Sequence, residues 1–187
     1  MKEWPKKWTQ SLVIPLPKKD NLKQWQNYRT ISLISHPSKI MLRVFLKRLK
    51  AKAEGLLAKE QAGFRPGRST SEQICNSRVI IEKHLHHQRD IFHNLIYFKK
   101  AFDRVWHAGL WQVLRSFNVG EELVQAIQAL YENSSSAVLL NRHLGEFFKT
   151  TAGVRKECLL LPILFNLFLE KIMQGTLHDH RTSIPIG

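Results

Sequence analysis

Among the residues of this sequence that could do chemistry, basic side chains are abundant, whereas adjacent pairs of aspartates are absent. The 187 residues include 29 Lys and Arg against 15 Asp and Glu, a formal net charge of +14. Chemistry on phosphates commonly needs clustered carboxylates to hold hard cations such as Mg²⁺. The sequence has four aspartates, no two of them adjacent: Asp20, Asp90, Asp103 and Asp179.

The positive charge is concentrated in the first half of the chain. Residues 1–100 carry 21 basic and 7 acidic side chains, whereas residues 101–187 carry 8 of each. Clustered Lys and Arg gain affinity for phosphates by releasing condensed counterions. The first half therefore predicts an acidic polymer as the partner, with a membrane surface as the competing interpretation.

Other candidate sites are weaker. Two histidine-rich strings, HLHH at 84–87 and HDH at 178–180, resemble metal clusters, but neither recurs at zinc-ligand spacing. Cys75 and Cys158 stand alone, so we predict neither a disulfide framework nor a structural metal site.

Targeting signals are also missing. The N-terminus has charge on both sides of a short apolar run, which is not the pattern of a secretory signal. The apolar stretch 158–169 falls short of the roughly 20 residues that span a bilayer, so it predicts a buried helix. We expect an intracellular protein, nuclear or cytoplasmic, that is neither secreted nor membrane-bound.

The elements that must position these residues predict one mixed α+β domain. The first half combines short β-branched runs, an amphipathic basic segment after Pro37, and a capping box formed by Ser69 and Glu72. We expect strands at 11–16, 29–34 and 91–98, the last one buried, and a hairpin formed by AVLL (137–140) with EFFKTT (146–151). Helices are predicted after Pro37, from Ser69 to about Asp90, and at 107–117, 121–131 and about 158–173.

Five strings occur in a characteristic order: IPLPKK with NYRTISLIS and SKI, then QAGFRPGRST, FKKAFDRVWH, ALYENSSSAVLL and GVRKECLLLPILFNLFLEKIM. Together they resemble the reverse transcriptase of non-LTR (LINE-type) retrotransposons, from about Trp8 to Ile186. The resemblance implies fingers at about 8–90 and a partial palm at about 91–187 of a right-hand polymerase, without the thumb. In the family, paired Mg²⁺ ions support RNA-templated DNA synthesis.

The family's metal ligands do not match this sequence. The resemblance aligns Tyr97 with the palm aspartate that binds metal, and a phenol with a pKa of about 10 is neutral at pH 7 and cannot replace a carboxylate. Asp103 matches a later aspartate, for which we expect a structural role. The family's ADD hairpin does not follow IPIG within these residues, so we expect no intact catalytic residue and no Mg²⁺ bound by this chain.

The segment GVRKECLLLP is altered as well. Lys156 and Glu157 stand where the family has Gln and Gly, and Leu161 stands where it has Ser. Glycine in such a turn allows a close approach of the backbone, which Glu157 would obstruct. We interpret these changes as decay of the catalytic centre.

The family's binding residues are retained. Lys18 and Arg29 match residues that grip the nucleotide triphosphate, and Phe102 matches the bulky residue that excludes a ribose 2′-hydroxyl. Arg65 and Arg68 match positions near the template strand. Each has a structural alternative, because Phe102 could pack in the core and Arg65 could solvate a loop.

Three functional hypotheses follow. The first is a retrotransposon-derived, catalytically inactive reverse transcriptase fragment that binds RNA or an RNA/DNA hybrid through the basic N-terminal half. The alternative is a non-enzymatic RNA- or DNA-binding module. The third is a truncated gene model of a longer, active enzyme, which an in-frame ADD in the genomic sequence after Gly187 would support.

Overall fold

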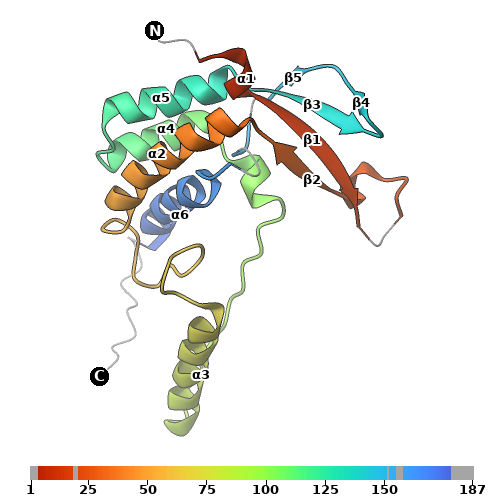
Figure 1. Cartoon of the computed structure of the whole chain (residues 1–187). Helices are drawn as coiled ribbons and strands as arrows, with labels where there is room; N and C mark the ends of the chain where they lie inside the picture. The colour runs from red at the N-terminus through yellow and green to blue at the C-terminus, as the bar shows by residue number, and fades with distance from the viewer. Residues whose placement is uncertain (1–3, 19–20, 151, 155–157, 178–187) are drawn as a thin grey trace.

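The computed structural model describes residues 4–18, 21–150, 152–154 and 158–177. It has the mixed α+β architecture that the sequence predicts, with a small twisted sheet beside a group of packed helices and one helix, α3, extending away from both (Figure 1).

The sheet is built around strand β1 (Gln10–Pro17), which is paired on both edges. On one edge it forms an antiparallel hairpin with β2 (Tyr28–Leu33), from the pair Leu12 and Leu33 to the pair Pro17 and Tyr28. On the other edge it runs parallel to β3 (Ser135–Leu140), a pairing between segments far apart in the chain. The two predicted N-terminal strands are confirmed.

Strand β3 also begins a C-terminal hairpin, but its pairing differs from the predicted one. Leu139 and Leu140 pair with Leu144 and His143, whereas the segment EFFKTT pairs with Ser135 and Ser136. Strand β3 thus pairs antiparallel with β4 (His143–Leu144) and with β5 (Phe148–Lys149), so the strand order is β2-β1-β3-β4 with β5 beside β3. The turn between β3 and β4 uses positive φ at Asn141 and Arg142. Asparagine tolerates this conformation better than most residues, which favours the turn here.

Four helices form the core, and their positions follow the apolar spacing of the sequence. They are α2 (His36–Ala53), α4 (His107–Ser116), α5 (Glu121–Glu132) and α6 (Leu161–Leu177). Short helical segments occur at α1 (Lys6–Thr9), η1 (Trp25–Asn27) and η2 (Ala101–Arg104). The most deeply buried core side chains include Leu42, Leu49, Leu110, Leu114, Val124, Ile127, Leu160, Leu164 and Leu167.

Helix α6 is the predicted apolar helix, although it begins three residues later than expected. Leu164 and Leu167 are buried against the other helices, and α6 packs beside both α2 and α4. Across the described ranges, no helix combines the length and hydrophobicity needed to cross a bilayer.

Helix α3 (Thr70–His86) begins where the capping box predicts, because the side chain of Ser69 accepts a hydrogen bond from the backbone N–H of Glu72 at 3.1 Å. None of its residues is buried. In Figure 1 it projects below the helical body.

The prediction of a buried strand at 91–98 is wrong. The segment is extended but belongs to no strand, and Phe92 and Leu95 are 95% and 94% exposed. An apolar run becomes a strand only when another strand supplies hydrogen-bond partners and a face to pack against. None of the described strands pairs with this segment.

Candidate nucleic-acid interface

The first cationic site lies at the loop end of the β1–β2 hairpin, where the chain passes from β1 to β2. Lys18 follows β1, and its backbone N–H donates to the Asn27 carbonyl at 2.9 Å, which extends the strand pairing by one residue. Arg29 pairs across the hairpin with Leu16. Because side chains alternate along a strand, Lys18 and Arg29 lie diagonally on the same face.

Both side chains at this site can reach a ligand. Lys18 and Arg29 are exposed, and Lys18 Nζ donates to the Gln26 carbonyl at 3.2 Å, a contact that solvent or a phosphate can replace. Figure 1 shows the loop end of the hairpin pointing away from the helical body. The arrangement can hold one or two phosphate groups with a point charge and a planar guanidinium.

Arg65 holds the 58–69 loop rather than facing solvent. Its side chain is 7% exposed and forms an ion pair with Glu54 at 2.7 Å. Its Nη1 also donates to the carbonyls of Ala58 and Gln61, at 2.6 and 3.1 Å. A largely buried guanidinium needs such partners, so Arg65 fastens the loop to the end of α2.

Arg68 differs from Arg65, because it stays accessible. Its side chain is 33% exposed, and its nearest acidic partner is Glu72 at 4.0 Å. Pro66 and Gly67 separate the two arginines, and Gly67 has a positive φ of 74°. The loop therefore buries one arginine as an anchor and presents the other to solvent.

Two polar residues of α6, which sequence analysis missed, complete the anchoring of this loop. Asn166 is 2% exposed, donates to the Gly63 carbonyl at 2.7 Å and accepts from Gln61 Nε2 at 3.2 Å. Glu170 is 8% exposed and accepts from the Ala58 backbone N–H at 3.1 Å. The sequence does carry a signal for this pair, because two polar residues four positions apart in an apolar helix share one face.

Phe102 lies where the loop, η2 and α6 meet. Its ring makes edge contacts with Phe165 at 4.7 Å and with Phe64 at 6.2 Å between centroids. It is half-buried and packs against the core. These contacts match the core-packing alternative, and they also join the loop that carries Arg68 to the start of the second half of the chain.

The backbone around Phe102 is held by the segment at 153–154. Gly153 has φ of 83°, and a Cβ there would lie 2.9 Å from the Asp103 carbonyl oxygen. Val154 N–H donates to the Phe102 carbonyl at 2.8 Å, and His107 Nε2 lies 2.7 Å from the Gly153 carbonyl. Since a carbonyl can only accept, that contact needs the proton on Nε2. Asp103 thus contributes its backbone to a tight junction.

The described residues do not fit a pair of Mg²⁺ ions. Tyr97 is 89% exposed on the unpaired 91–98 segment, and no group of three or more His, Cys, Asp or Glu side chains in the described ranges could hold a metal ion. Asp179 and the HDH string lie outside those ranges. A phenol offers one neutral oxygen, which is a poor ligand for a hard divalent cation.

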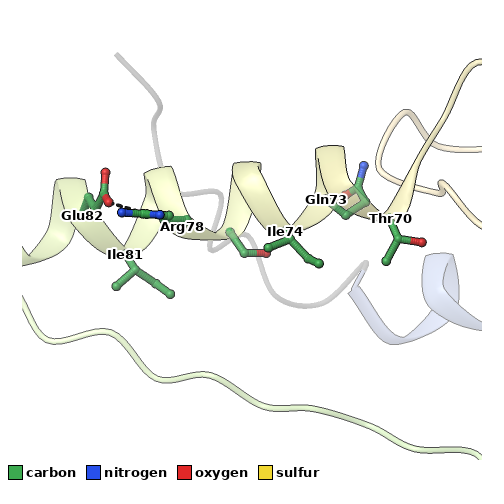
Figure 2. Close-up of a pocket in the computed structure, with 7 residues that line it drawn as sticks. Thr70, Gln73, Ile74, Arg78, Ile81 and Glu82 are labelled. Carbon is green, nitrogen blue, oxygen red and sulfur yellow. Dashed lines mark hydrogen bonds and ion pairs between the residues drawn. The ribbon is translucent and has the colours of Figure 1, made fainter.

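A shallow hollow follows one face of α3 (Figure 2). Its residues recur at helical spacing, and Arg78 pairs with Glu82 at 2.7 Å along it. Mainly apolar atoms line the hollow, including those of two isoleucines, and it is open to solvent rather than a built site. It is lined by Thr70, Gln73, Ile74, Ser77, Arg78, Ile81 and Glu82.

The structure brings together only part of the predicted binding set. Phe64 contacts Phe102, so the loop with Arg65 and Arg68 adjoins Phe102. Lys18 and Arg29 are neighbours of one another on the separate hairpin.

The comparisons with a family model and with curated proteins agree with one another. Residues 16–185 match the family model described as reverse transcriptase (RNA-dependent DNA polymerase). The chain is 28% identical over 175 residues to the transposon TX1 uncharacterized 149 kDa protein of Xenopus laevis, covering 91% of this chain and 13% of that protein. It is 28% identical over 152 residues to the probable RNA-directed DNA polymerase from transposon X-element of Drosophila melanogaster, covering 79% of this chain and 16% of that protein.

Among solved structures, the chain is similar to apo telomerase from Candida tropicalis truncated from its C-terminal domain. The TM-score is 0.63 with 12% sequence identity, and the match covers 92% of this chain and 40% of the telomerase chain. At this identity the likeness establishes a shared fold. The chain spans about one-seventh of the length of the two transposon proteins above.

Proposed function

Because the chain belongs to the reverse transcriptase (RNA-dependent DNA polymerase) family, with relatives in non-LTR retrotransposons, we propose that it is a catalytically inactive reverse transcriptase domain that retains nucleic-acid binding. The partner is RNA or an RNA/DNA hybrid, bound through the basic N-terminal half. A nuclear or cytoplasmic location is part of the same proposal.

The observation that carries this proposal is Tyr97. It stands where the resemblance places the family's palm aspartate, and its phenol lies in solvent on a segment without strand partners. The two-metal reaction needs carboxylates to bridge and neutralise the cations, and a neutral phenol supplies no charge for this purpose. The donor set among the described residues does not fit Mg²⁺.

The same proposal assigns residues 8–90 to fingers and 91–187 to a partial palm. The β1–β2 hairpin with Lys18 and Arg29 then binds the nucleotide triphosphate, and Phe102 lies beside the sugar. Arg68 approaches the template strand. Arg65 contributes to template binding through its anchoring contacts, which set the position of Arg68.

A primer-extension assay tests the proposed inactivity. On poly(rA)/oligo(dT) with Mg²⁺ or Mn²⁺, we expect no template-dependent DNA synthesis above a heat-killed control. Synthesis by the unsubstituted chain would contradict the proposal. A Tyr97→Asp variant compared with Tyr97→Phe then asks whether this position alone is responsible, because only the aspartate restores a metal ligand.

Nucleotide cross-linking tests the assignment of the hairpin. Lys18→Gln or Arg29→Gln should reduce cross-linking of a photoreactive dNTP, because each removes a charge that faces the triphosphate. Lys23→Gln is the matched control, since Lys23 is exposed on the same turn. Equal losses in all three variants would point to net charge rather than to a site.

The alternative, a non-enzymatic RNA- or DNA-binding module, is favoured by the concentration of positive charge in residues 1–100. Filter binding across a salt series tests binding in both cases. We expect affinity for RNA that falls as salt rises, because bound cations release counterions. A chain with no affinity at low ionic strength would contradict both hypotheses.

A further inference from the structure

Helix α2 carries a basic surface that the proposed nucleotide and template sites do not use. Its 18 residues include six Lys and Arg and no Asp or Glu. Four of these cations, which we call the α2 row, are Lys39, Arg43, Lys47 and Lys50, and all four are exposed. At about 100° per residue their spacing places them within one sector about 80° wide.

The cations of the α2 row have no acidic partners within the part of the chain that the structure describes. The four ion pairs there belong to Arg65, Arg68, Arg78 and Arg115. Like charges four residues apart, such as Arg43 and Lys47, weaken a helix. This repulsion between like charges extends along three turns of α2. A bound polyanion would replace it with attraction between the cations and the phosphates.

The α2 row is also held rigidly before any ligand binds. Leu42 and Leu49 on the opposite face are 1% and 0% exposed, and Ser35 caps the start of the helix. A ligand would therefore meet charges whose backbone is already ordered, which lowers the entropic cost of binding.

We infer that the α2 row binds the sugar-phosphate backbone of a nucleic-acid strand, at a site separate from Lys18 and Arg29. The inference rests on the proposed function and names the surface that contacts the strand. The row runs from Lys39 to Lys50, a span of 12 residues and about 17 Å of helix. That length matches about five phosphates at the ~3.4 Å axial spacing of one strand in a duplex.

The shape of α2 favours nucleic acid over an anionic membrane. A helix that lies in a membrane interface inserts its apolar face into lipid. The apolar face of α2 is instead occupied by the protein core. On its exposed side, Ile40 and Val44 are the large apolar side chains.

The test compares two double variants of the same helix. Arg43→Gln/Lys47→Gln removes one Arg and one Lys from the α2 row. Arg48→Gln/Lys52→Gln removes one Arg and one Lys from the opposite edge of the exposed face, with the same change in net charge and the same four-residue spacing. Circular dichroism and thermal melting of both variants establish that α2 still folds.

Fluorescence anisotropy with a labelled RNA across a KCl series gives the readout. We expect the row variant to lose affinity by roughly tenfold or more at low salt. Its log–log salt slope should fall by about 1.4–1.8, since each of the two lost phosphate contacts contributes about 0.7–0.9. The control variant should change far less. Equal losses in the two variants, or no loss in the row variant, would overturn the inference.

Two further outcomes separate this inference from the proposed function. DNA synthesis in the primer-extension assay would contradict catalytic inactivity and leave the α2 row untouched. RNA binding that persists unchanged in the row variant would overturn the α2 row and leave the proposed function standing. Binding of the wild-type chain to phosphatidylserine vesicles without binding to RNA would overturn both, in favour of a membrane partner.

Discussion

Helices α2 and α3 are 18 and 17 residues long and both begin at a capping serine, yet only α2 is packed. Along α2, Leu42, Phe45 and Leu49 form a continuous stripe that lies in the core. Along α3, Ser77 and Arg78 interrupt the stripe between Ile74 and Ile81, and no residue is buried. The comparison teaches that capping and periodicity predict a helix, whereas continuous apolar area decides whether it packs.

The unpacked helix α3 must rely on local interactions. Isolated helices of this length are marginal in water. The Ser69 cap, the Arg78–Glu82 ion pair and the longer Arg68–Glu72 pair are local contacts that support it. The 91–98 segment that follows is exposed in the same way, so the chain contains a packed body and an unpacked arm, defined as residues 70–98.

The largest expected difference between body and arm comes from leucine truncation. Leu49→Ala in α2 should lower the free energy of unfolding by about 2–5 kcal/mol, because the side chain is 0% exposed and leaves a cavity. Leu85→Ala in α3, where the leucine is 67% exposed, should change it by less than about 0.5 kcal/mol. Denaturant unfolding measures both. Equal effects would mean that α3 is packed in solution.

A second comparison uses two glycines with positive φ, one in the packed body and one in the loop just before the arm. Gly153→Ala in the body should destabilise by roughly 2–4 kcal/mol, because it combines a positive φ with a Cβ placed against the Asp103 and Phe102 backbone. Gly67→Ala, before the arm, has positive φ but open space, and should cost about 1–2 kcal/mol. Thermal unfolding of the two variants gives the ranking, and the reverse order would contradict this account of the junction.

The two capping serines give the third comparison. Ser35→Ala and Ser69→Ala each remove a helix cap. Each should destabilise the capped helix by about 1 kcal/mol. For Ser35 we expect the loss in global unfolding, since α2 belongs to the core. For Ser69 the loss should appear as faster hydrogen exchange of α3 amides with little change in global stability. A global effect of Ser69→Ala as large as that of Ser35→Ala would break the comparison.

The smallest effect concerns surface ion pairs. Arg115 donates two hydrogen bonds to Glu121 at 2.9 Å, and this bonding lowers the pKa of the Glu121 carboxyl. A lowered folded-state pKa gives stability that is present above the ordinary glutamate pKa and is lost as pH falls through the lowered value. Both side chains are exposed, so the effect should be weaker than that of either cap.

The measurement for this pair is the melting temperature of the wild type and of Glu121→Gln across acidic pH. The difference between the two proteins should shrink as the carboxylate of Glu121 is protonated. A difference that stays constant with pH would show that the ion pair is not its source. Arg78→Gln on α3 is the companion variant, and its effect should appear in the exchange of α3 alone.

Much of the secondary structure could be predicted from the sequence, because its signals are local. The strands at 11–16 and 29–34, the helices at 107–117 and 121–131, and the Ser69 cap are confirmed. The 91–98 strand was not predictable in the same way. Its apolar run is a local signal, but pairing depends on segments elsewhere in the chain.

The same distinction between local signals and long-range contacts applies to the candidate site. The resemblance to reverse transcriptases predicted that Lys18 and Arg29 bind a nucleotide triphosphate, and the structure puts both on one exposed face of a hairpin. For Arg65 and Arg68, two similar arginines in one loop, sequence predicted the same role. Only packing distinguishes them, because Glu54 and two carbonyls surround the first and solvent reaches the second.

The sequence by itself determined the family and the excess of positive charge in the first half, because these depend on residue identity and order. Only the tertiary structure decided which cations are buried anchors, which remain free along α2, and that α3 stands apart from the core. The physical reason is that burial and pairing are properties of segments distant in the chain. Asn166 and Gly63, joined at 2.7 Å, are such a pair.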